Sequence, residues 1–142
     1  PEHTEVAIAL NNLGHVLSTA SRYKEAEPIL RQALQLHEKL LGSNHQAVAI
    51  DLMNLADLLM KTNRHKEAEP ILVKHLTALV SITVSSGKTH PMFKDGVDSF
   101  ILCQQKTGGT LQDFREKMRK ILTPEGVNSE ALDRLRIEML GK

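Results

Sequence analysis

The chain contains an internal repeat, which constrains its fold more than any other feature. Residues 3–44 align with residues 45–86 without a gap, at an offset of 42 residues, and 17 of the aligned pairs are identical. The densest block is Lys24–Leu30, which recurs as Lys66–Leu72. Self-similarity at a period of this length is the signature of a repeat architecture. Each copy is therefore predicted to be one structural unit.

Each unit is predicted to contain two helices. In the first unit, apolar residues recur at helical spacing in both halves, at Val6, Leu10, Leu13, Leu17, Ala26, Ile29, Leu30, Ala33, Leu34, Leu40 and Leu41. The breaks at residues 19–22 and 61–64 are short and rich in Ser, Thr and Asn, which favours antiparallel hairpins with tight turns. Residues 42–44 supply a C-cap followed by an N-cap candidate. Because such a hairpin cannot bury its apolar face alone, the units must stack.

One local rule opposes this interpretation. Pro28 and Pro70 lie inside the second helix of each unit, where proline removes a backbone hydrogen bond and can kink the helix. Both prolines come within the first turns of their helices, where the lost bond has the smallest cost. We expect the helices to continue with a slight bend.

These residues resemble tetratricopeptide repeats, and more narrowly the 42-residue variety of kinesin light chains and many bacterial repeat proteins. The resemblance rests on His3–Gly14, Arg22–Ile29 and Leu41–His45, and it covers residues 3–76 well. It implies an all-α fold in which antiparallel helix hairpins stack into a right-handed α-solenoid.

The family pattern also implies where the helices approach one another closely. Its small residues fall here on Gly14, Ala26, Ala56 and Ala68. Its large packing residues fall on Leu10, Leu13, Leu17, Leu30, Leu52, Leu55, Leu59 and Leu72. The second unit departs from the first at His75, where the first unit has Ala33.

The rest of the chain is predicted to be a degenerate third repeat over residues 90–122 and a capping helix over residues 128–140. Together with the two clear repeats they would make residues 1–142 a single domain. The third repeat restarts at His90, and two glycines at 108–109 mark its hairpin turn.

Two details of this C-terminal part can be tested by a structure. Thr110 and Asp113 resemble a capping box that opens a helix, and Ser129 is the expected start of the last helix. The apolar run Leu76–Val84 allows two interpretations. It is either a long second helix covered by the third repeat or an exposed patch for a partner.

The resemblance implies that extended peptides or partner helices bind on the concave side, which the first helices line. The residues expected there are Asn11, Asn12, His15, Ser18, Met53, Asn54, Asp57, Met60 and Lys61. Asn12 and Asn54 occupy the same repeat position, and a carboxamide can donate to and accept from a peptide main chain. The alternative is that these asparagines bond a neighbouring helix or loop.

The chemistry of this surface differs from that of kinesin light chains, which pair such asparagines with cations that meet acidic peptides. Here Lys61 is the one cation, and it shares the surface with Asp57. This weakens any inference of acidic ligands. Met53 and Met60 either offer an adaptable apolar contact or belong to the core.

Composition and motifs argue against other function classes. The 18 basic and 17 acidic residues are interspersed, so neither nucleic acid nor a membrane surface is an expected partner. We expect no enzyme activity, cofactor or metal, because catalytic motifs and zinc-ligand spacings are absent and the recurring histidines open each unit. Cys103 is interpreted as a small buried hydrophobe. With no transmembrane run or signal peptide, a cytoplasmic location is expected.

The leading hypothesis is a scaffold or adaptor segment that binds a protein ligand in its concave groove. One alternative is a self-association module that forms a homo-oligomer through its exposed repeat end. Another is a regulatory arm of a larger enzyme or DNA-binding protein, because the chain opens with Pro1 directly in repeat-like sequence.

Overall fold

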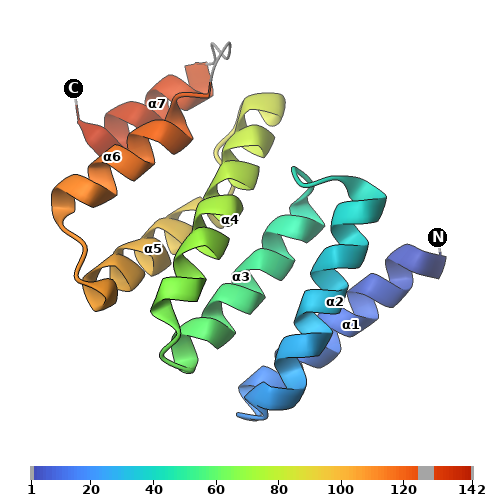
Figure 1. Cartoon of the computed structure of the whole chain (residues 1–142). Coiled ribbons are helices and arrows are strands. Elements are labelled where there is room, and N and C mark those ends of the chain that lie inside the picture. Colours follow the sequence, from blue (N-terminus) through green and yellow to red (C-terminus); the bar gives the residue numbers. More distant parts are fainter. Residues whose placement is uncertain (1, 125–129, 142) are drawn as a thin grey trace.

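The computed structural model describes residues 2–124 and 130–141, and within them the chain forms seven α-helices and no strand. The helices are α1 (Glu2–Thr19), α2 (Tyr23–Leu41), α3 (Gln46–Lys61), α4 (His65–Ser86), α5 (Phe93–Thr107), α6 (Leu111–Leu122) and α7 (Glu130–Leu140). Figure 1 shows antiparallel hairpins that follow one another in chain order from the N-terminal to the C-terminal end. The predicted all-α solenoid of helix hairpins is confirmed.

The turns inside the first two units have the same construction. Ser21 and Asn63, which are 42 residues apart, adopt left-handed backbone conformations with φ angles of 61° and 60°. In each turn the following arginine N–H donates to a helix carbonyl 2.8 Å away, from Arg22 to Leu17 and from Arg64 to Leu59. Residues other than glycine rarely adopt positive φ, and asparagine does so more readily than most. The repeated sequence thus fixes a repeated tight turn.

The small residues of the family pattern are buried, and Gly14 lies at a close contact between α1 and α2, as predicted. A β-carbon on Gly14 would come within 2.6 Å of the Leu30 side chain, so α1 and α2 leave little room for a side chain at this contact. Ala26, Ala56 and Ala68 have no exposed surface. All four small residues therefore belong to the packed interior of the two hairpins.

Both prolines lie inside helices that continue beyond them, as predicted. Pro28 is the sixth residue of α2, and Pro70 is the sixth residue of α4. The first four N–H groups of any helix have no intrahelical partner, so a proline here removes only one of the earliest helical hydrogen bonds. The helix interior keeps its full ladder.

The recurring histidines have a structural role at the unit starts. The N-cap of α3 is His45, whose Nδ1 accepts a hydrogen bond from the Ala47 N–H at 3.1 Å. Similarly, His90 Nδ1 accepts from the Met92 N–H at 3.2 Å, just before α5. The N-cap expected within residues 42–44 was therefore placed too early, although Gly42 does cap α2 with a φ of 82°.

The long apolar helix α4 is covered by the third hairpin. Within the run Leu76–Val84, the side chains of Leu76, Leu79 and Val80 are 3% exposed or less. This confirms the first interpretation of the run, because α5, α6 and α7 all pack against α4.

His75, the departure from the first unit, is accommodated in this interface. Its Nδ1 lies 2.8 Å from the Ala49 carbonyl oxygen, and its ring lies against Gly96 of α5, where an added β-carbon would come within 2.7 Å. Burial lowers the pKa of His75. The larger ring at this repeat position is therefore matched by a glycine on the neighbouring helix.

Helix α6 begins at the predicted capping box, and α7 packs against α6 and α4. Thr110 and Asp113 form the reciprocal capping box that starts α6. Helix α7 buries Leu132 and Leu135, and Arg136 Nε donates to the Leu122 carbonyl at 2.8 Å, which ties α7 to the end of α6. The predicted start at Ser129 lies outside the described residues.

One packing prediction is wrong. Leu13 and Val6 were expected to pack in the core, but their side chains are 48% and 50% exposed. Their repeat equivalents in α3, Leu55 and Val48, have no exposed surface. The difference arises because α2 covers this face of α3, whereas no helix in the described part of the chain covers the same face of α1.

Candidate functional site

The predicted ligand surface lies on the first helices of the two clear hairpins. Helix α1 carries Asn11, Asn12 and His15, and helix α3 carries Met53, Asn54, Asp57 and Lys61. Residues three and four apart lie on the same face of a helix, so each set forms a short row. The two helices also contact each other directly.

One hydrogen bond joins the two rows. Asn54 Nδ2 donates to Asn11 Oδ1 at a distance of 2.9 Å, and both side chains are half-buried. This bond satisfies part of each carboxamide and links α1 directly to α3. For Asn54, the alternative that it bonds a neighbouring helix is therefore correct.

Asn12 has a different environment, although it occupies the same repeat position as Asn54. Its side chain is exposed, and so is that of His15 one turn later. In the first row, Asn11 makes the bond to α3, and the Asn12 side chain is open to solvent. Asn12 is thus the asparagine that a ligand could reach most readily.

The two predicted charges of this surface neutralise each other. Lys61 Nζ lies 2.7 Å from Asp57 Oδ2 on the same helix, and the two side chains are 43% and 49% exposed. An exposed pair at this spacing stabilises a helix by only about 0.3–0.5 kcal/mol. Its main consequence is that this part of the surface has no strong net charge.

The remaining predicted residues contribute less open surface. Met53 and Met60 are partly buried and pack against the main apolar cluster, as the core interpretation predicted. Ser18 was expected on the inner surface, but its side chain is 5% exposed and its Oγ has no hydrogen-bond partner among the described residues. The prediction that Ser18 lies on the inner surface is wrong, because this face of α1 packs toward α2.

A family model of the tetratricopeptide repeat matches residues 5–79, which is more than half of the chain. The chain belongs to the tetratricopeptide repeat family. A search of curated proteins found no match.

Tetratricopeptide repeats generally mediate contacts between proteins and are typically not enzymes. Among the described residues, no group of three or more His, Cys, Asp and Glu side chains could hold a metal ion. None of the helices of residues 2–124 and 130–141 has the length and apolar character to cross a bilayer.

Cys103 is buried as predicted. Its Sγ donates to the His65 carbonyl at 3.1 Å, and burial raises the pKa of the thiol.

Two features of this tetratricopeptide repeat chain were not predicted from its sequence. His37 and Asp51 form a buried pair between α2 and α3, with Nδ1 and Oδ2 2.6 Å apart and both side chains 2% exposed or less. Two arginines of α6 line a surface hollow beside Leu140. The buried pair has no repeated counterpart, because the equivalent positions hold Leu79 and Ala9.

Proposed function

We propose that this chain is a protein-interaction module that holds an extended peptide or a partner helix against the shared face of α1 and α3. The observation that carries the proposal is the Asn54–Asn11 hydrogen bond. It links the two first helices directly, and Asn12 and His15 of α1 are exposed. A rigid polar surface of this kind binds at a lower entropic cost than a flexible one.

The chemistry of the surface favours a ligand that is recognised mainly through its main chain. Asn12 offers both a donor and an acceptor, and the Lys61–Asp57 pair leaves little net charge. We therefore expect a neutral peptide here, in contrast to the acidic ligands of kinesin light chains. The 42-residue kinesin light chain-like variety of repeat, and a scaffold or adaptor role, are part of this proposal.

Truncating Asn12 to Ala should weaken ligand binding by about 0.5–1.5 kcal/mol, the net worth of a neutral hydrogen bond. The probe is a peptide selected on the wild-type chain from a random library without Asp or Glu, and the measurement is titration calorimetry. Folding should not change, because the Asn12 side chain is exposed.

The matched control is Lys24→Ala, which removes an exposed side chain from α2 and should leave the affinity unchanged. Asn54→Ala is a poorer probe, because it also removes the bond to Asn11. Equal affinities for the wild-type chain and Asn12→Ala, with a loss in Lys24→Ala, would place the ligand on the outer helices instead.

A second candidate function, self-association, is favoured by a separate observation. Val6, Leu13 and Val16 form an apolar stripe on α1 and are 50%, 48% and 62% exposed. The equivalent residues of α3 form the buried interface with α2. We propose that the stripe packs against the same stripe of a second copy, which is the two-fold arrangement that a self-complementary surface allows.

The stripe proposal predicts a concentration-dependent dimer in sedimentation velocity, and Leu13→Glu should abolish it without altering the helical content. Lys24→Glu is the control and should dimerise as the wild-type chain does. A wild-type chain that sediments as a monomer at every concentration tested would rule out this second function and leave the first intact.

A further inference from the structure

We infer that the hollow between α6 and the end of α7 is a second protein-contact site, which binds a peptide oxyanion next to an apolar side chain. The hollow has a volume of about 450 Å³ and is lined by Gln112, Arg115, Glu116, Arg119, Lys120 and Leu140. Ligand-binding clefts typically measure roughly 300–1,000 Å³. This site lies on the third hairpin and the last helix, outside the surface of α1 and α3.

The ion pairing of the arginines distinguishes this hollow from the rest of the described surface. Of its seven arginines, five pair with a carboxylate: Arg22, Arg31, Arg64, Arg134 and Arg136. Among the described residues, Arg115 and Arg119 are the two without such a partner, and both line the hollow. Both arginines without a described carboxylate partner thus lie along the lining of the same hollow.

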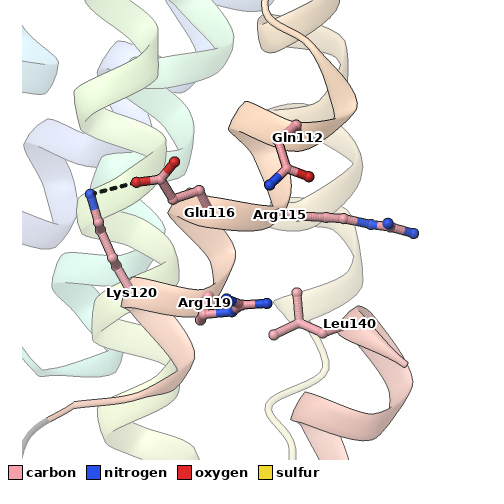
Figure 2. A pocket seen from close by; sticks show the side chains of 6 residues that line it. All are labelled: Gln112, Arg115, Glu116, Arg119, Lys120 and Leu140. Atoms are coloured by element: carbon pink, nitrogen blue, oxygen red, sulfur yellow. Dashed lines mark ion pairs between the residues drawn. The ribbon is translucent and has the colours of Figure 1, made fainter. Parts of the chain in front are cut away.

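The spacing of these two arginines is unfavourable within α6. Arg115 and Arg119 lie four residues apart on α6, where like charges repel and destabilise the helix. Glu116, the acidic residue in the hollow, bonds Lys120 instead, with its Oε1 3.3 Å from Nζ. Figure 2 shows this ion pair on one side of α6 and the two arginines on another. The repulsion would be relieved by an anion from outside the chain.

The side chains that line the hollow indicate which anion it would bind. A guanidinium group matches the planar, bidentate geometry of a carboxylate or phosphate, and the Gln112 amide adds a further donor. In Figure 2 the Arg119 side chain extends toward Leu140, so charge and apolar surface meet. The ligand is therefore a peptide segment with an acidic or phosphorylated side chain next to a leucine-like residue.

The test uses the full chain labelled with nitrogen-15 and three acetylated, amidated tetrapeptides: Leu-Asp-Asp-Leu, Leu-Asn-Asn-Leu and Leu-phosphoserine-Asn-Leu. The Nε–H signals of Arg115 and Arg119 should shift saturably with the carboxylate and phosphate peptides and not with the Asn peptide. Comparing the two affinities shows which oxyanion the hollow prefers. An equal response to the Asn peptide would overturn the inference.

The double variant Arg115→Gln/Arg119→Gln should bind at least tenfold more weakly, and its unfolding temperature should not fall, since both side chains are exposed. The matched control is Arg134→Gln, which removes an exposed arginine of α7 that already pairs with Glu130 and should bind normally. Binding that survives in the double variant, or is lost equally in the control, would contradict the site.

Discussion

Replacing Asp51 with Ala is expected to destabilise the fold by about 3–5 kcal/mol, the usual cost of removing one partner from a buried pair. Asp51 Oδ2 lies 2.6 Å from His37 Nδ1, and burial raises the pKa of Asp51, an effect that the hydrogen bond to His37 partly opposes. Without the carboxylate, His37 loses its Nδ1 partner, and among the described residues its Nε2 has none. Urea unfolding at pH 7 measures the loss.

The repeat itself supplies the control for this prediction. The position of His37 holds Leu79 in the second unit, and the position of Asp51 holds Ala9 in the first. The double variant His37→Leu/Asp51→Ala should therefore recover most of the lost stability, because apolar replacement of a buried pair is often neutral or stabilising. A double variant no more stable than Asp51→Ala alone would show that the site cannot accept an apolar pair.

Leu55→Ala is expected to cost about 2–5 kcal/mol, whereas Leu13→Ala at the same repeat position should cost less than about 1 kcal/mol. Leu55 has no exposed surface, while Leu13 is 48% exposed. Truncation of Leu55 leaves a cavity at the interface with α2, but truncation of Leu13 removes atoms that already contact solvent. Thermal unfolding at low protein concentration, where the chain is monomeric, gives both values.

The difference in lost stability between Leu55→Ala and Leu13→Ala tests how the two helices are packed. Equal losses in Leu13→Ala and Leu55→Ala would mean that something covers the α1 stripe even in the monomer, and the packing described here would be wrong. A larger loss for Leu13→Ala only at high concentration would instead support dimerisation through the stripe.

Much of the fold could be predicted from the sequence because the two copies of the repeat indicate the same structure. The hairpin turns, the helices through Pro28 and Pro70 and the close contact at Gly14 all follow from residues that recur or that fill a family position. The capping box of α6 could be found without a repeat, because Thr110 and Asp113 signal it locally.

Two differences from the predictions arose where equivalent positions have different neighbours. Leu13 and Leu55 match in sequence, but one helix face is covered and the other is not. Likewise, Asn12 and Asn54 match, yet Asn54 bonds Asn11 while Asn12 is exposed. Repetition predicts the conformation of a residue, whereas its burial depends on what lies beside the unit.

The missed sites differ in how far the sequence could have revealed them. Arg115 has no acidic residue three or four positions away, so its lack of an ion pair within α6 could be read from the sequence. The His37–Asp51 pair could not be predicted in this way, because it joins two helices and interrupts the repeat pattern on both sides. Only the three-dimensional arrangement brings these two side chains together.

The most direct test of the central claim is to map the binding surface by nitrogen-15 amide chemical shifts, with the neutral peptide selected on the wild-type chain. We expect the largest shifts on α1 and α3, at and around Asn11, Asn12, His15 and Asp57. The same shifts should appear in Lys24→Ala. Shifts concentrated on the outer face of α2 and α4, with α1 and α3 unchanged, would contradict binding on the shared face of α1 and α3.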